Sequence, residues 1–189
     1  GSMEEPGGDT AGTVPGSPYA AAKVAATGYG RLFHALYDLP VVSLRVFMVY
    51  GPGRQDEAKL VPYVIRSLLA GEAPALSSGA RAVDWVYVDD VVAAFLAAAT
   101  ADPPHDGLFE QSIDVGTGVL TTIRAVAERL AAEVGDGPGP RFGAVPDRPL
   151  EREPRADLAP ARALLGWSPA TALDEGLART VAWFREHDR

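Results

Sequence analysis

The sequence predicts an α/β fold, and three stretches of the chain carry this prediction. Residues 18–37 form a long alanine-rich stretch that is typical of a helix. Residues 41–49 are a nearly continuous apolar run rich in β-branched side chains, which is the pattern of a buried parallel strand. Residues 83–88 have the pattern of another strand, and an alanine-rich helix pattern follows at 91–99. Alternating helices and strands indicate a sheet covered by helices.

Residues 1–16 are predicted to lie outside this fold. Gly1-Ser2-Met3 has the form of a tag remnant ahead of a native start. Residues 4–16 are rich in glycine, proline, threonine and acids, and Val14 is their single aliphatic side chain larger than alanine. We therefore expect a tag scar and flexible arm at residues 1–16 and a single α/β unit at 17–189.

The helix at residues 18–37 carries the first candidate site. Ser17 can cap this helix, and Pro18 suits its first turn because a missing N–H costs nothing there. Tyr19 and Lys23 are four residues apart, so they lie on one face of the helix. A positive charge beside a phenol favours the phenolate, which can act as a base. Many helices carry this pair without any chemistry, so the pair alone leaves the question open.

The rest of the chain continues the alternation of helices and strands. Arg45 interrupts the apolar run at 41–49 and needs a partner if it is buried. Asp89 and Asp90 precede the helix at 91–99, and we expect them to cap its N-terminus. Further helices are expected at residues 60–69, from 121 or 122 to 134, at 158–165 and at 173–186. Further short strands are expected at residues 75–78, 112–115 and 141–145.

Glycine-containing turns in this chain lack the pattern of a dinucleotide-binding loop. Gly116-Thr117-Gly118 precedes a helix, but no third glycine follows, so we expect only a turn there. Gly51-Pro52-Gly53 follows a strand, but proline has no N–H to donate to a phosphate. Binding of a dinucleotide needs a strand, a glycine-rich turn and a helix N-terminus for the pyrophosphate, and this sequence offers no such series.

The composition excludes several classes of function. The formal net charge is −8 and there is no basic stripe, which argues against a nucleic-acid partner. The chain has no cysteine, which excludes disulfides and thiolate metal sites and fits a cytoplasmic location. No apolar run reaches the roughly 18 residues that span a bilayer, so we expect no membrane partner. We also expect no metal site.

Five blocks of the sequence occur in a recognisable order. They are Tyr19-Ala20-Ala21-Ala22-Lys23, Leu44-Arg45-Val46-Phe47-Met48-Val49-Tyr50-Gly51-Pro52, Val83-Asp84-Trp85-Val86-Tyr87-Val88-Asp89-Asp90-Val91, Asp114-Val115-Gly116-Thr117-Gly118 and Leu165-Gly166-Trp167-Ser168-Pro169. The series resembles the extended short-chain dehydrogenase/reductases of the NAD-dependent epimerase/dehydratase family, which act largely on nucleotide sugars. The resemblance covers the chain from about residue 17 onward and matches the C-terminal portion of that family.

This resemblance implies a fold and a catalytic pair. The fold would be the remnant of a Rossmann-like doubly wound parallel sheet plus the small C-terminal substrate subdomain of the family. Tyr19 would take a proton from a sugar hydroxyl while hydride passes to the nicotinamide of NAD. Lys23 would hydrogen-bond the nicotinamide ribose, so both residues would also contact the cofactor. The third member of the family's catalytic set is a serine or threonine on an earlier strand, and we find no residue in this sequence that matches it.

The resemblance also implies substrate-binding positions. Met48 stands where the family often has an asparagine that contacts the sugar nucleotide, and a thioether cannot replace an amide. Val83 stands where the family often has an arginine for the diphosphate, and Arg81 could partly replace it. Arg148 and Glu151 match a segment that holds the base and ribose, although a solvated charge cluster explains them equally well.

Three functions remain open at this point. The first is a truncated nucleotide-sugar epimerase or dehydratase with NAD in the complete enzyme, the isolated chain being inactive and binding no NAD. The second is a related NAD(P)-dependent reductase of a non-nucleotide small molecule, which Met48 and Val83 would suit. The third is a non-catalytic binding or oligomerisation module. We expect a dTDP- or UDP-linked sugar as ligand, and a homodimer or segment-exchanged oligomer built on the helix at 18–37.

Overall fold

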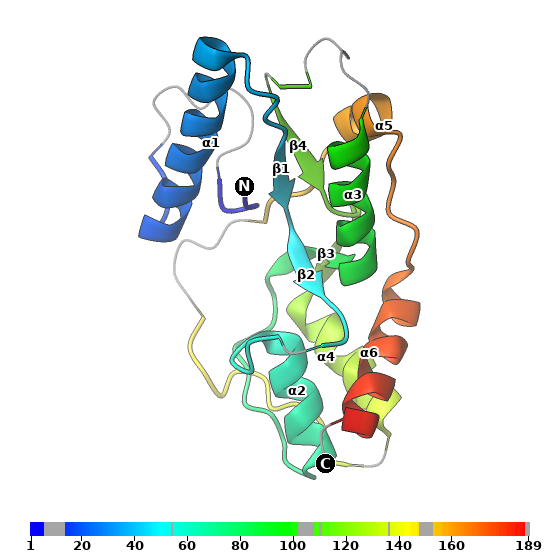
Figure 1. Ribbon diagram of the computed structural model, residues 1–189. Coiled ribbons are helices and arrows are strands. Elements are labelled where there is room, and N and C mark those ends of the chain that lie inside the picture. Colours follow the sequence, from blue (N-terminus) through cyan, green and yellow to red (C-terminus); the bar gives the residue numbers. More distant parts are fainter. Residues whose placement is uncertain are drawn as a thin grey trace.

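A computed structural model describes residues 1–5, 14–53, 55–101, 108–109, 111–135, 137–147 and 153–187. Within them the chain is a mixed α/β structure with parallel strands, as predicted (Figure 1). The helices are α1 (Pro18–Tyr37), α2 (Leu60–Leu69), α3 (Val88–Thr100), α4 (Ile123–Val134), α5 (Ala159–Leu165) and α6 (Leu173–His187). The strands are β1 (Ser43–Val46), β2 (Met48–Tyr50), β3 (Ala82–Tyr87), β4 (Ser112–Val115) and β5 (Leu120–Thr122).

The predicted helices are confirmed, and local capping explains several of their ends. The Ser17 hydroxyl oxygen accepts the Ala20 N–H at 3.1 Å, and α1 ends at Asp38, which adopts the left-handed conformation at φ 52°. Thr122 caps α4 in the same way, accepting the Ala125 N–H at 3.1 Å. Among the described helices, none is long and apolar enough to cross a bilayer.

The apolar run at 41–49 forms two consecutive strands rather than one. β1 pairs in parallel with β4, with Val46 opposite Val115, and β2 pairs in parallel with β3, with Met48 opposite Trp85. Phe47 lies between them and still donates its N–H to the Val115 carbonyl at 3.0 Å. β3 also pairs antiparallel with β5, a strand that the sequence pattern does not predict. Strands therefore flank β3 on both edges, which makes it the centre of its sheet.

The strands predicted at 75–78 and 141–145 are wrong. These two segments lie side by side, joined by one parallel bridge between Ala75 and Arg141 and by backbone hydrogen bonds such as Leu76 N–H to the Arg141 carbonyl at 2.9 Å, but neither forms a regular strand. Pro74 and Pro146 flank the two segments, and neither has an N–H with which to extend a ladder.

Residues 1–5 lie against the fold, in contrast to the flexible arm predicted for residues 1–16. Ser2 forms a parallel bridge with Val46, and the Met3 N–H donates to the Val46 carbonyl at 3.0 Å. Ser2, Met3 and Glu5 are buried. The Glu5 carboxylate accepts hydrogen bonds from the Ser2 N–H and from the Thr27 hydroxyl of α1. The edge of β1 supplies backbone hydrogen-bond partners that cannot be predicted from composition. Residues 6–13 lie outside the described part.

The main core lies where α2, α4 and α6 pack together beside β3 (Figure 1). Its side chains from α2 and α4 include Val64, Ile65, Val126 and Leu130, all fully buried. The predicted inner stripe of α6 is confirmed, with Gly176, Leu177, Thr180, Val181 and Phe184 buried. By contrast, α1 buries only Ala20. The chain therefore has a well-packed C-terminal region and a first helix that is largely uncovered.

Gly176 is the position in α6 that lies closest to the aromatic rings of the sheet. A Cβ atom there would overlap the Tyr50 hydroxyl and lie 2.9 Å from Tyr87 Cδ2. Tyr50 is buried and its hydroxyl donates to the Leu173 carbonyl at 3.3 Å, so the ring has no room to withdraw. We expect Gly176→Ala to lower the free energy of unfolding by about 2 kcal/mol, because overpacking outweighs the helix propensity of alanine. Urea denaturation measures this difference.

The matched control is Gly28→Ala in α1. A Cβ atom at Gly28 meets nothing within 4 Å, so this change should leave stability unchanged or raise it by up to about 1 kcal/mol. Equal stability changes for the two variants would contradict the steric argument.

Candidate functional site

The predicted Tyr19–Lys23 pair is formed on the first turns of α1. Lys23 Nζ lies 5.4 Å from the centroid of the Tyr19 ring, so the ammonium and the phenol occupy one face of the helix. The Tyr19 side chain is 55% exposed, which leaves it accessible to a ligand. The structure therefore places the two side chains of the predicted pair next to each other on an accessible helix face.

A cavity of about 540 Å³ lies between α2 and the face of β2 and β3. Met48 and Arg81 both line it, so the structure brings together two of the predicted substrate residues. The Met48 side chain lies opposite Trp85 across the β2–β3 ladder, and Val83 lies on the same wall. Arg81 comes directly before β3 and places its Nη2 3.7 Å from the Glu4 carboxylate.

The walls of this cavity are partly apolar and partly polar. Leu60, Val83 and Ile123 supply apolar surface. Lys59 and Arg81 supply positive charge, and Asp56 adds one carboxylate. Trp85 Nε1 already donates to the Thr121 carbonyl at 3.0 Å, which fixes the indole ring in the wall. Such a cavity suits a ligand with a flat or apolar body and an anionic group.

The other predicted site residues are separated from this cavity or lie outside the described part. Lys23 lines a different cleft, between α1, β1 and α3, and neither it nor Tyr19 lines the cavity of Met48 and Arg81. Arg148 and Glu151 fall in residues 148–152, which the structure does not describe. Within the described residues, no group of three His, Asp or Glu side chains could hold a metal ion.

The residues on both sides of segment 148–152 are hydrogen-bonded to residues close to Arg81 in the sequence. Before the segment, Asp147 accepts the N–H of Ser78 at 3.0 Å and its hydroxyl at 2.9 Å, and these bonds lower the pKa of the Asp147 carboxyl. After the segment, the Glu153 carboxylate accepts the Ala82 N–H at 2.7 Å. Asp147 and Glu153 thus bind Ser78 and Ala82, which lie three residues before and one residue after Arg81 in the sequence.

Asp84 is a residue whose role the sequence pattern does not reveal. Its carboxylate is fully buried in β3 and accepts four hydrogen bonds. The donors are the Thr117 N–H and hydroxyl, both at 2.7 Å, the Gly118 N–H at 2.8 Å and the Ala156 N–H at 3.1 Å. The amides of the Gly116-Thr117-Gly118 turn therefore serve an internal carboxylate, which confirms the prediction of a turn there. The only signal in the sequence is an acidic residue within an apolar strand.

Asp114 makes a second connection of this kind, from β4. It forms a bidentate ion pair with Arg45, at 2.6 Å from Nε and 2.9 Å from Nη2, so the predicted partner of Arg45 is found. The same carboxylate accepts the Asp157 N–H at 2.9 Å. Asp84 and Asp114 together fasten residues 156 and 157 to two neighbouring parts of the sheet.

The prediction that Asp89 and Asp90 cap the next helix is wrong. α3 begins earlier, at Val88, and its N-cap residue Tyr87 makes no side-chain capping bond. Asp90 is buried and accepts the N–H groups of Ala170 and Thr171, both at 3.1 Å. A donor far along the chain is therefore preferred to the local amides, because residues 170 and 171 need acceptors where they pass α3.

Comparisons with known proteins give consistent matches. Residues 1–110 match the model of the NAD dependent epimerase/dehydratase family. The chain is 42% identical over 175 residues to a UDP-glucose 4-epimerase of Mycolicibacterium smegmatis, covering 90% of the chain and 54% of that protein. It is 33% identical over 184 residues to a dTDP-glucose 4,6-dehydratase of Xanthomonas campestris pv. campestris, covering 93% of the chain and 51% of that protein.

Solved structures give the same result for the fold. A UDP-glucuronic acid 4-epimerase from Bacillus cereus, in complex with UDP-glucuronic acid and NAD, superposes with a TM-score of 0.79 at 26% identity. That match covers 92% of the chain and 54% of the other protein. The chain thus spans about half the length of the relatives that it matches.

Asp84 can be tested by removing one acceptor oxygen. Asp84→Asn places an NH₂ group among donors, and hydrogen bonds to a charged group contribute about 1.5–3 kcal/mol each. We expect this variant to lose about 3 kcal/mol of unfolding free energy and to expose the Thr117 and Gly118 amides to faster hydrogen exchange. Asp89→Asn is the control, because Asp89 is exposed in the first turn of α3 and its replacement should change stability by less than about 0.5 kcal/mol. An Asp84 variant as stable as the control would show that the four bonds contribute little.

Proposed function

Because the chain belongs to the NAD-dependent epimerase/dehydratase family, we propose that it supplies the tyrosine–lysine pair and the substrate cavity of a nucleotide-sugar epimerase or dehydratase. The observation that carries the proposal is the cavity between α2 and β3. It combines apolar surface with the cations Lys59 and Arg81, which outnumber its one carboxylate, Asp56. A nucleotide sugar has a flat base, a sugar and a diphosphate, which this combination of surfaces suits.

Tyr19 and Lys23 are the proposed catalytic residues. Tyr19 would accept the proton of a sugar hydroxyl, and Lys23 would stabilise the phenolate while hydrogen-bonding the nicotinamide ribose. Their spacing of four residues and the 5.4 Å approach of Lys23 to the Tyr19 ring support this assignment. NAD, when bound, would supply the hydride acceptor.

The residues of this chain that would contact NAD, Tyr19 and Lys23, reach only its nicotinamide and the attached ribose. In the Gly116-Thr117-Gly118 turn, the amides of Thr117 and Gly118 already donate to Asp84 and are not available to a phosphate. The sequence holds no glycine-rich turn that joins a strand to a helix N-terminus in the manner of a dinucleotide loop. We therefore propose that this chain by itself holds no NAD.

Arg81, Met48, Arg148 and Glu151 are the proposed substrate contacts. Arg81 would bind the diphosphate in place of the arginine that the family often has at the position of Val83. The bonds that tie Asp147 and Glu153 to the approach of β3 support a role for the intervening Arg148 and Glu151 in holding the nucleotide.

A smaller, non-nucleotide substrate is the second candidate. Met48 and Val83 both face the cavity, and neither can hydrogen-bond a sugar or pair with a diphosphate. A reductase of a less polar small molecule would make use of these apolar walls.

Titration of this chain with UDP and UDP-glucose separates the two candidates. We expect weak but saturable binding of UDP, because the cavity retains cationic and apolar contacts. Arg81→Ala should weaken it by about tenfold, the equivalent of one charge-assisted contact. Arg129→Ala is the matched control, because Arg129 pairs with Asp174 outside the cavity and should leave the affinity unchanged. Calorimetry measures each affinity, and NAD titrated in the same way should give no measurable heat.

Failure of UDP and UDP-glucose to bind up to millimolar concentration would favour the second candidate. Binding that is equal in the Arg81 and Arg129 variants would place the nucleotide elsewhere on the chain.

The exposed side of α1 supports self-association. Its apolar side chains are unusually uncovered, with exposures from 46% to 69% for Tyr29, Leu32, Phe33, Leu36 and Tyr37. Uncovered apolar area costs about 25 cal/mol per Å², so a partner that covers this surface stabilises the chain. We propose a homodimer or a segment-exchanged oligomer built on α1.

The double variant Leu32→Glu, Leu36→Glu tests this interface. Two buried charges would disfavour association, so the variant should be monomeric where the unaltered chain is dimeric or larger. Light scattering at tens of micromolar measures the mass. Leu69→Glu on α2, at a position 37% exposed, is the control and should keep the assembly. An unaltered chain that scatters as a clean monomer would refute the proposal.

A further inference from the structure

Trp85 of β3 borders two cavities. One is the cavity of about 540 Å³ that Met48 and Arg81 also line. The other is a pocket of about 360 Å³, formed by Trp85, the turn before β5, β5 itself and the segment that leads into α6. Among the described residues that line the two, Trp85 alone is shared. The smaller pocket is therefore a separate space, and we call it the β5 pocket.

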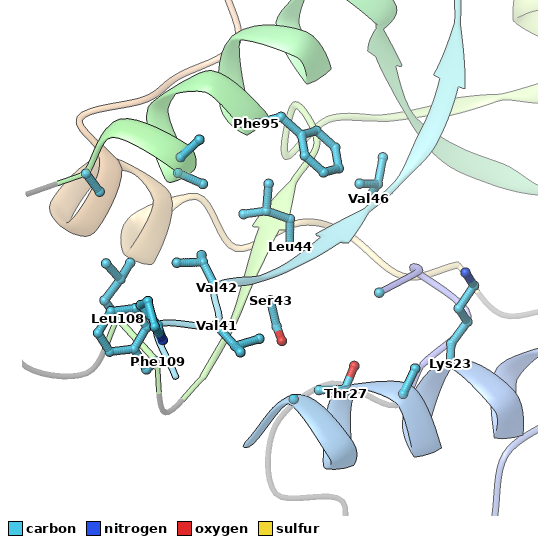
Figure 2. Close-up of a pocket in the computed structure, with 17 residues that line it drawn as sticks. Lys23, Thr27, Val41, Val42, Ser43, Leu44, Val46, Phe95, Leu108 and Phe109 are labelled. Carbon is cyan, nitrogen blue, oxygen red and sulfur yellow. The ribbon is translucent and has the colours of Figure 1, made fainter. Parts of the chain in front are cut away.

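The β5 pocket is also separate from the helix that carries Tyr19 and Lys23. Figure 2 shows Lys23 and Thr27 of α1 and Val46 of β1 around the larger cleft, of about 780 Å³. That cleft depends on α1, whose side chains are largely uncovered. No described residue of α1, β1 or α3 lines the β5 pocket, so its shape does not depend on what covers α1.

Two buried carboxylates hold opposite walls of the β5 pocket in place. Asp84 accepts the Thr117 N–H at 2.7 Å, which fixes the turn before β5. Asp90 accepts the N–H groups of residues 170 and 171, both at 3.1 Å, which fixes the segment that leads into α6. The pocket is therefore formed before any ligand arrives, and a preformed site loses less free energy to ordering when it binds.

The lining of the pocket is uncharged and combines apolar surface with hydroxyl groups. Trp85 supplies an indole ring, fixed by its hydrogen bond to the Thr121 carbonyl at 3.0 Å, and Leu173 supplies aliphatic surface. Thr121 lies opposite Val83 in the β3–β5 ladder, so its side chain is on the sheet face that also carries Trp85. Within the described residues, the hydroxyls of Thr121 and Thr171 have no hydrogen-bond partner, so both can bond a ligand.

We propose that the β5 pocket binds a small uncharged molecule with a flat or cyclic apolar body and a hydroxyl group. The apolar body would contact the Trp85 indole, and the hydroxyl group would bond Thr121 or Thr171. The volume of the pocket lies near the lower end of the range for ligand sites, so the ligand is small. A charged molecule is disfavoured, because no described lining residue could pair with its charge after water is lost. The site is independent of the proposed function.

Benzyl alcohol, benzoate and benzylammonium are matched probes, because they share one ring and differ in charge. We expect benzyl alcohol to bind with a dissociation constant of about 1 mM, as is usual for so small a ligand. Benzoate and benzylammonium should bind at least about tenfold more weakly. NMR titration measures each affinity from the amide signals of Thr121 and Thr171, which line this pocket and not the larger cavity. Equal affinity for the three probes, or no shift of these signals, would overturn the proposal.

The double variant Thr121→Val, Thr171→Val tests the hydroxyl groups. Valine keeps the branched shape of threonine, so the pocket should retain its volume while it loses both hydroxyls. Binding of benzyl alcohol should weaken at least about fivefold, whereas the double variant Thr121→Ser, Thr171→Ser should stay within about twofold of the unaltered chain. Thermal melting verifies that both variants are folded. Equal affinity of the valine and serine variants would contradict the assigned role of the hydroxyls.

A matched pair of valines shows which cavity the probe occupies. Val119 is 61% exposed and lines the β5 pocket, whereas Val145 is 45% exposed and lines the cavity of Met48 and Arg81. Val119→Glu adds a carboxylate to the β5 pocket, so benzylammonium should bind at least about fivefold more tightly than to the unaltered chain. Val145→Glu should change this affinity less than about twofold. A gain with Val145→Glu, or none with Val119→Glu, would overturn the proposal.

Discussion

The arrangement of this chain depends on buried carboxylates that accept main-chain N–H groups. Asp84, Asp90 and Asp114 are all buried, and each accepts bonds from segments distant in the sequence. A buried carboxylate is tolerated only when its oxygens are satisfied, so each aspartate requires its loop to lie where it does. Between α4 and α6, Asp84 and Asp114 hold residues 156 and 157 to the sheet, and Asp90 holds residues 170 and 171 to α3.

Asp84 and two exposed carboxylates, Asp147 and Glu153, also connect the sheet to segments near the cavity. Asp84 lies in β3, one position after Val83 of the cavity wall, and binds the turn that precedes β5. Glu153 binds the first residue of β3, and Asp147 binds the loop before Arg81. One wall of the cavity is β3 with the residues before it, and these residues are hydrogen-bonded to Asp147 and Glu153 on either side of residues 148–152. Rigid framing of this kind keeps polar contacts in place before a ligand arrives.

The sequence predicts the helices well, but it does not predict the hydrogen bonds between buried aspartates and distant main-chain N–H groups. Helical periodicity and capping at Ser17 and Thr122 are local properties, so the bounds of α1 and α4 follow from neighbouring residues alone. The sequence predicts a local cap for Asp90, yet its partners lie 80 and 81 residues along the chain, where no local pattern can reveal them. The same reasoning explains residues 1–5, which are polar in composition but find acceptors on the edge of β1. Met48 and Arg81 were predicted by resemblance, and only the pairing of β2 with β3 brings them to one cavity.

The position of the tyrosine–lysine pair is the part of the structure that this chain determines least. α1 buries one residue, Ala20. A hydrogen bond from the Thr27 hydroxyl to the Glu5 carboxylate connects the helix to residues 1–5. A catalytic base must be held to within a fraction of an ångström of its proton donor, and a helix with so little cover cannot provide that restraint alone. Two uncovered surfaces border α1: the cleft beside β1 and the exposed apolar side at Tyr29, Leu32 and Leu36. Filling either surface would bury part of α1 and, under the proposed function, would restrict the positions of Tyr19 and Lys23.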